Sequence, residues 1–364
     1  MCKSKCVSSV ILFLGVICLV QNVVTQVQSS ASNSLSPVEI NQLQAKAQAG
    51  DPTAQLNLGK AYEDGNGVAQ NDNHALKWYR AAAEQGNAGA QNNLGLMFRL
   101  GRGVEQDKPE AVKWYRKAAK QANPSAMFNL GAAYYNGDGV TTDDVAASAW
   151  FLLAQSFGSR PAGDAAKRMS NEVSLSETFE KIGDMYQKGD DLPQSSNEAV
   201  TWYRKATENG GAAVQMKLAS LLLEDPNAVS NYGEIHRLCE KAANLRFSPG
   251  AFCMGRMYEE GLGERDLSKA AQWFAKAVVL GHAVAALRLG EMYWKGEGVK
   301  QDKISAYVFI DLASTSDLPE ARQEKGRLEK ELTPKEIQKG KAKVIEWNLQ
   351  HRPLVLKQQP LSVN

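Results

Sequence analysis

The chain has 364 residues, with 42 basic and 40 acidic side chains and a formal net charge of +2. Its first two lysines, Lys3 and Lys5, stand in an N-terminal segment without acidic residues, so the rest of the chain carries 40 charges of each sign. Nucleic acids and anionic membrane surfaces favour proteins with a basic excess. The composition therefore gives no indication of either as a partner.

Residues 1–29 have the pattern of a cleavable secretory signal. Two lysines precede an apolar run of 14 residues from Val7 to Val20, and small polar residues follow near Ser29. A membrane-spanning helix needs about 20 apolar residues, so this run is short for one. The pattern predicts export, to a periplasm or to the medium, with no integral membrane segment after cleavage; a signal anchor is the alternative.

A short helix is predicted ahead of the rest of the chain. Ser36 and Glu39 have the spacing of a capping box, and Pro37 takes the first helical position. We expect a capping helix over residues 37–50.

Behind this helix, one pattern returns with a period close to 36 residues. A small residue marks each repeat, at Gly59, Gly95, Gly131, Gly183, Ala219, Gly255 and Gly290. A large apolar residue follows 18 or 19 residues later, at Trp78, Trp114, Trp150, Trp202, Leu238, Trp273 and Phe309. A period of this length is typical of a repeat solenoid, in which each repeat packs on its neighbours.

Each repeat contains two stretches with apolar residues at helical spacing. A Gly-x-Gly-Val loop, such as residues 65–68, separates them and supplies the positive φ that ends a helix. The second stretch follows a favoured N-cap residue in every repeat: Asn71, Asp107, Asp143, Ser195, Asn231, Asp266 and Asp302. Three glutamates are expected to bond back to the cap amide: Glu110, Glu198 and Glu234. We expect the marker glycines to bring the two helices of a repeat backbone to backbone, and the tryptophans to fill the space between repeats.

The segment AQLNLGKAYEDGNGVAQNDNHALKWYRAAAEQG resembles a Sel1-like repeat, a relative of the tetratricopeptide repeat with a longer loop. The resemblance covers residues 51–158 (repeats one to three) and 175–315 (repeats four to seven). It implies an all-α fold, an α/α superhelical solenoid of about seven helix-turn-helix repeats. It also implies a scaffold or adaptor that binds proteins or extended peptides through its concave first-helix surface. A cysteine-rich bacterial branch is linked to β-lactam hydrolysis, so a hydrolase of β-lactams or cell-wall peptides is the alternative function, although this chain lacks the dense cysteines.

Residues 159–174 form an insertion that connects the third and fourth repeats. At an offset of 159 residues, Met169 and Ser174 correspond to Leu328 and Thr333. We therefore expect each half of the array to end in the same module. Capping helices are predicted over residues 316–350, with one beginning at Thr333 and Pro334, followed by a tail at 351–364.

Motifs for catalysis are not apparent. The four histidines stand far apart, and no metal-ligand or nucleophile pattern occurs, so we predict no enzyme activity, no cofactor and no metal site. Cys239 and Cys253 are the two cysteines outside the signal. In an oxidising compartment they could form a disulfide between the fifth and sixth repeats; two free thiols are the alternative.

Two columns of side chains are candidates for a peptide-binding face. Two residues before each marker stand Asn57, Asn93, Asn129, Lys181, Lys217, Cys253 and Arg288. In tetratricopeptide proteins, asparagines in this column bond the backbone of a peptide, and an amide offers both a donor and an acceptor. The cations Lys181, Lys217 and Arg288 are expected to hold carboxylates. Four residues after the marker, Arg99, Tyr135 and Trp294 are further candidate contacts; the alternative is that both columns are solvated helix faces.

Overall fold

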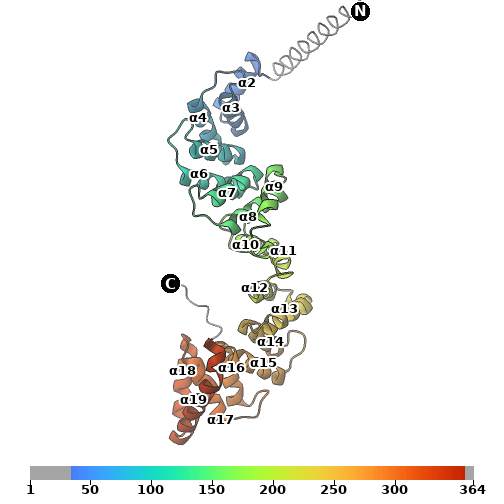
Figure 1. The fold of residues 1–364 in the computed structure, drawn as a ribbon, viewed down its shortest axis with the longest axis vertical. Helices are drawn as coiled ribbons and strands as arrows, with labels where there is room; N and C mark the ends of the chain where they lie inside the picture. Colours follow the sequence, from blue (N-terminus) through green and yellow to red (C-terminus); the bar gives the residue numbers. More distant parts are fainter. Residues whose placement is uncertain (1–33, 357–364) are drawn as a thin grey trace, which may run out of the picture. The chain divides into compact units, whose positions relative to one another are not determined.

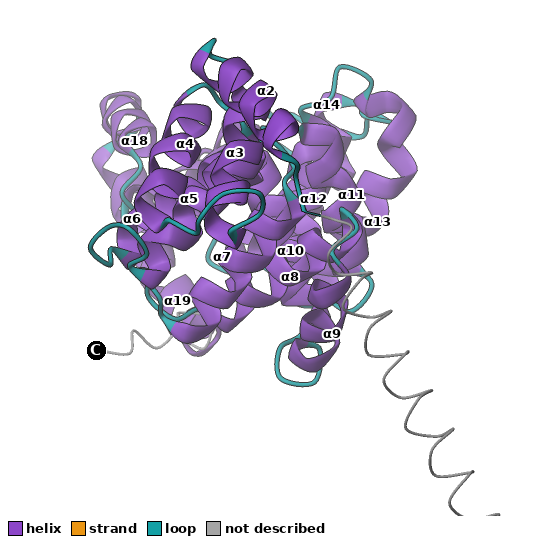
Figure 2. Ribbon diagram, turned by 90° about the horizontal axis from the view of Figure 1, so that it is seen from above, coloured by secondary structure: helices purple, strands orange, loops and turns teal. Residues whose placement is uncertain are grey.

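The computed structural model describes residues 34–356 of the chain. Within that range it consists of α-helices and loops with one 3₁₀ helix and no strand (Figure 2). The predicted signal at 1–29 lies outside the described residues and stays a prediction. None of the helices between residues 34 and 356 combines the length and the apolar character that crossing a membrane requires.

The described chain forms two compact units, here called unit 1 (residues 34–173 and 191–193) and unit 2 (residues 174–190 and 194–356). In each unit, helices that follow one another in sequence pack against one another (Figure 1). Unit 1 contains α2 (Pro37–Gln48), α3 (Pro52–Asp64), α4 (Asp72–Glu84), α5 (Ala88–Leu100), α6 (Lys108–Ala119), α7 (Pro124–Asn136), α8 (Asp144–Ser156) and α9 (Arg160–Met169).

Unit 2 continues the alternation of first and second helices. It contains α10 (Leu175–Lys188), α11 (Ser196–Thr207), α12 (Ala212–Leu223), η1 (Ala228–Asn231), α13 (Tyr232–Asn244), α14 (Ser248–Glu260), α15 (Leu267–Val279), α16 (Ala283–Lys295), α17 (Lys303–Ser314), α18 (Pro319–Glu331) and α19 (Pro334–Leu356). The predicted all-α class is confirmed. The last helix extends to Leu356, beyond the expected end of the capping helices at 350, and residues 357–364 of the expected tail lie outside the described range.

Each marker glycine makes room for a buried side chain of the second helix in the same repeat. A Cβ built on Gly59 would lie 2.6 Å from ring atoms of Tyr79. The pairs are Gly59–Tyr79, Gly95–Tyr115, Gly131–Phe151, Gly183–Tyr203, Gly255–Phe274 and Gly290–Ile310. The expected close approach to the backbone of the second helix is found at Gly95 and Gly290, where such a Cβ would lie 3.1 Å from the Ala111 and Ala306 carbonyl oxygens. In all six pairs, however, the nearest contact is a side chain from the position after the tryptophan column. In the fifth repeat, where Ala219 replaces glycine, the smaller Cys239 stands at the ring position.

Trp114 packs between successive repeats, as predicted, and Trp78 packs between the first repeat and the preceding helix α2. Trp78 of α4 is half-buried against a cluster that includes Ala47 of α2 and Leu58 of α3. Trp114 of α6 packs in the same way on the cluster formed by α4 and α5. The tryptophan column therefore packs each repeat on the helix before it, while the side chain at the following position packs the two helices of one repeat together.

The predicted N-caps form in six of the seven repeats, where the cap side chain accepts a bond from a first-turn amide. Asn231 makes no such bond, because η1 leads directly into α13. The expected return bonds from glutamates were wrong: the Asp107 N–H donates to the Phe98 carbonyl, and the Ser195 N–H to that of Tyr186. The cap amide thus donates to a carbonyl of the first helix and not to Glu110 or Glu198. Glu234, the third glutamate, accepts from the Arg204 guanidinium.

The two glycines of each loop have different tasks. Gly101, at φ 68°, ends α5 in the left-handed conformation. Gly103 lies against the preceding repeat, since a Cβ there would be 2.6 Å from the Asp72 carbonyl oxygen. A Cβ on Gly139 would overlap the Lys108 carbonyl in the same way. The loops therefore fix the distance between one repeat and the next.

The stability of unit 2 is expected to depend on pH through His282. Its Nδ1 accepts from the Ala285 N–H (3.2 Å) at the start of α16, and its ring stacks on Phe252. Burial lowers the pKa of His282 below its ordinary value of 6.5. The unfolded chain therefore binds a proton at a higher pH than the folded chain does. The free energy of unfolding has its largest value above about pH 6.5, and it falls as the pH drops toward the lowered pKa of the folded protein.

The test is chemical denaturation between neutral and mildly acidic pH. His282→Asn keeps a capping acceptor but does not titrate, so we expect its stability to fall less than that of the wild type. Parallel pH dependences of the two proteins would contradict this account.

Candidate peptide-binding face

The asparagine column lies on three successive first helices of unit 1. Asn57 of α3 is exposed, whereas Asn93 of α5 and Asn129 of α7 are half-buried. The Asn129 Nδ2 donates to the Asn92 Oδ1 (2.8 Å), and the Asn92 Nδ2 donates to the Asn93 Oδ1 (3.2 Å). These bonds tie the two helices together and fix the orientation of their amides.

The linking residue, Asn92, was not predicted. It is buried and stands three residues before the marker, in a column that is otherwise mostly apolar: Leu56, Phe128, Met216, Phe252 and Leu287. The other polar member of the column, Glu180, likewise binds the next repeat, through Lys217. A polar residue in an apolar column was the sequence signal for both contacts.

The tyrosine hydroxyls reach the first helix four residues beyond the marker. In the first repeat, the Tyr79 hydroxyl donates to Glu63 (2.5 Å), which also accepts from Arg102 (2.8 Å). Burial raises the pKa of Tyr79, the bond to Glu63 raises it further, and Asn93 acts in the opposite direction. The ring that fills the space beside the marker glycine therefore also contributes a polar group to the surface of the first helices. We call this surface, formed by the residues two before and four after each marker, the first-helix face.

In the fourth repeat the same geometry gives the Tyr203 hydroxyl hydrogen-bond partners on the first helix. Its hydroxyl lies 2.7 Å from both the Asp184 Oδ1 and the Gln187 Oε1. The pKa of Tyr203 is raised, first by burial and then by the bond to Asp184. Asp184 and Glu180 also hold the ammonium of Lys217, at 2.7 and 2.8 Å. Lys217, which was expected to bind carboxylates of a ligand, thus forms ion pairs with two carboxylates of α10.

The other residues of unit 2 that were predicted to bind a peptide also interact with groups of the protein itself. Lys181 is half-buried and has an interaction partner, and Arg288 is exposed but pairs with Glu291 (3.2 Å). Trp294 is half-buried, with Lys303 and Arg327 at 5.4 and 5.2 Å from its ring. Cations of α17 and α18 therefore cover this candidate anchor.

The sixth-repeat member of the column, Cys253, is joined by a disulfide to Cys239, with the two Cα atoms 5.8 Å apart. The bridge links α13 to α14, which is the first of the two alternatives stated for these cysteines.

In the second repeat, the equivalent tyrosine lacks an acceptor. Tyr115 is fully buried and packs on Gly95, but its neighbour four residues beyond the marker is Arg99, itself half-buried. Neither the Tyr115 hydroxyl proton nor the Arg99 Nε–H has an acceptor among the described residues. Burial raises the pKa of Tyr115 to about 12, and Arg99 opposes that rise.

Tyr135, the third-repeat residue of this column, is 49% exposed and borders a mainly apolar pocket. The pocket lies among α7, α8 and α9, and its lining residues are Tyr135, Phe151, Ala165, Arg168, Met169 and Glu172. The face of unit 1 thus offers an exposed amide, an unpaired donor group and an apolar recess.

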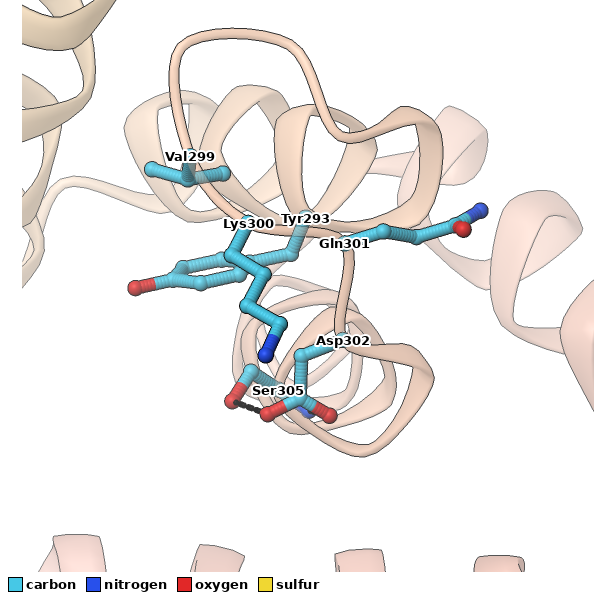
Figure 3. A pocket seen from close by; sticks show the side chains of 6 residues that line it. All are labelled: Tyr293, Val299, Lys300, Gln301, Asp302 and Ser305. Atoms are coloured by element: carbon cyan, nitrogen blue, oxygen red, sulfur yellow. Dashed lines mark hydrogen bonds between the residues drawn. The ribbon is translucent and has the colours of Figure 1, made fainter.

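A second pocket lies in unit 2 and contains a serine next to a carboxylate (Figure 3); its lining residues are Tyr293, Val299, Lys300, Gln301, Asp302 and Ser305. The Ser305 hydroxyl donates to the Asp302 Oδ2 (2.7 Å), and the Asp302 Oδ1 accepts from the N–H groups of Ile304 and Ser305. Burial alone would raise the pKa of Asp302, but the bonds from Ser305 and Ile304 outweigh it and lower the pKa. The pair is a helix cap and gives no support to the hydrolase alternative. Across residues 34–356, His, Cys, Asp and Glu nowhere form a group of three or more that could hold a metal ion.

Two matched substitutions test the difference between the tyrosines. Tyr79→Phe removes a bond to a carboxylate and should lower the free energy of unfolding by about 1–2 kcal/mol. Tyr115→Phe removes a hydroxyl without a partner, so it should leave stability unchanged or raise it by up to about 1 kcal/mol. Chemical denaturation of both variants measures this; equal destabilisation would show that Tyr115 has an acceptor.

The repeats of the chain match a known family. The Sel1 repeat family model matches residues 52–87, 88–123, 124–154, 181–211, 249–282 and 283–317, more than half of the chain. It leaves the atypical fifth repeat unmatched. A search of curated proteins gave no match.

Two solved structures are similar to the chain. A protective antigen of uropathogenic Escherichia coli strains, which displays an SLR fold, is 25% identical over 89% of this chain and 98% of its own, with a TM-score of 0.33. A Sel1 repeat protein from Oxalobacter formigenes is 28% identical over 80% of each chain, with a TM-score of 0.37. By the match of its repeats, the chain belongs to the Sel1 repeat family.

Proposed function

We propose that the protein is an exported, non-enzymatic scaffold that binds an extended peptide segment of a partner protein on the first-helix face of unit 1. Sel1 repeats typically mediate protein interactions. The observation that carries the proposal is the row of asparagines on α3, α5 and α7, two of which are held in a fixed orientation through Asn92.

The row suits a peptide backbone because each amide offers a donor and an acceptor. Asn57 is exposed, and the bond to Asn92 uses the Nδ2 of Asn129 but not its Oδ1. Unit 1 is favoured over unit 2, since Lys217 and Arg288 pair with protein carboxylates. Groups with fixed orientation cost less to order on binding, which supports the same face.

Export is supported by two independent features. The N-terminal segment has the pattern of a secretory signal. The structure contains a disulfide between Cys239 and Cys253, and disulfides persist in oxidising compartments. A periplasm or the extracellular medium fits both.

Peptide binding can be tested with random linear peptides displayed on phage and selected on residues 34–364. For the selected peptides, fluorescence anisotropy should show that Asn57→Ala weakens binding about three- to tenfold, the loss of one hydrogen bond. Glu84→Ala, an exposed change on the second helix α4, is the matched control and should bind as the wild type does. Failure to select any peptide, or equal binding by Asn57→Ala, would contradict the proposal.

The compartment can be tested by counting thiols. Residues 34–364 contain Cys239 and Cys253 as their only cysteines. Protein recovered from a periplasm and denatured without reductant should show no free thiol, and reduction should lower its stability by roughly 3 kcal/mol for a loop of this length. Two free thiols before reduction would support the alternative and remove one argument for export.

A further inference from the structure

We propose that Arg99 and Tyr115 form a carboxylate-binding position within the first-helix face of unit 1. The position would take an acidic side chain, or the C-terminal carboxylate, of the bound peptide. This inference rests on the proposed function, because it specifies a chemical group of the same ligand.

The repeats themselves show what is missing at this position. In the first repeat the tyrosine hydroxyl donates to Glu63, four residues beyond the marker. In the fourth it lies 2.7 Å from both Asp184 and Gln187, so in both repeats the first helix supplies an acceptor. In the second repeat the residue four beyond the marker is Arg99, which has donors only. Two donors therefore stand together where the first and fourth repeats, the two others with a tyrosine at this position, have a donor and an acceptor.

Both groups have a proton for which the described part of the protein supplies no acceptor. Tyr115 has no exposed surface, and although Arg99 acts on its hydroxyl oxygen, neither the hydroxyl proton nor the Arg99 Nε–H has an acceptor among residues 34–356. A buried donor without a partner costs free energy in the unbound protein. A ligand that supplies an acceptor recovers this cost on binding.

A carboxylate fits the position better than a neutral acceptor. Its two oxygens can accept from the hydroxyl and the guanidinium at once, and charge-assisted bonds to arginine are the stronger kind. The acid of the protein whose charge acts on Tyr115 is Asp138, and Lys108 already holds its carboxylate at 2.6 Å. Arg99 thus offers its charge to a group from outside the chain.

Three pools of fluorescent peptides with randomised flanks provide the test. The first has a central glutamate and an amidated C-terminus, the second has glutamine in its place, and the third has glutamine and a free C-terminal carboxylate. Residues 34–364 should bind the first or the third pool about tenfold more tightly than the second. A preference for the first pool identifies a side chain as the carboxylate, and a preference for the third identifies the chain end.

Variants locate the effect. Arg99→Gln should abolish the preference, and Tyr115→Phe, which keeps the ring on Gly95, should reduce it. Lys113→Gln, which removes an exposed positive charge on α6, should leave it intact and so controls for net charge.

Equal binding of all pools by the wild type, or a preference that survives Arg99→Gln, would overturn the inference. If the pools bind equally and Asn57→Ala weakens them all, the proposed function stands and only the carboxylate position is lost. If no pool binds, both are contradicted.

Discussion

The insertion of a buried side chain into the space left by a marker glycine determines both the packing and the surface of the repeats. Gly95 sits so close to Tyr115 that a Cβ would overlap the ring. The contact brings the two helices of a repeat together, and it also directs the tyrosine hydroxyl through the core toward the first helix. The same contact therefore stabilises the fold and supplies chemistry to the candidate binding face.

The residue that stands four beyond the marker differs between repeats whose helices pack in the same way: it is Glu63, Arg99 and Gln187 in the three repeats with a tyrosine. Glu63 in the first repeat, and Asp184 with Gln187 in the fourth, give the hydroxyl an acceptor inside the protein, whereas Arg99 leaves two donors without an acceptor. Since a native protein rarely retains an unpaired buried polar group without a reason, the exception in the second repeat is informative. A solenoid can change its ligand chemistry one repeat at a time in this way.

The elements of the fold were predictable because their signals are local. The capping residue at Asp107 and the helix-ending Gly101 act within a few residues of their own position. Contacts between side chains of different repeats were harder to predict. Lys217 was expected to face a ligand, but it forms ion pairs with Asp184 and Glu180 of the neighbouring first helix. Such pairings depend on which faces of successive helices meet, and the period alone does not determine this.

The spacing of the binding groups depends, finally, on contacts made by the loops. Arg102 binds Asp72 of the preceding repeat at 2.7 Å, and in the next repeat the signs are reversed, with Asp138 on Lys108 at 2.6 Å. Pairs this exposed contribute little to stability, but a slipped register would place like charges together. Since the second loop glycine also touches the neighbouring backbone, the positions of α3, α5 and α7 relative to one another are fixed. An extended peptide then meets donors and acceptors that are already in place, and less of the binding free energy is lost in ordering them.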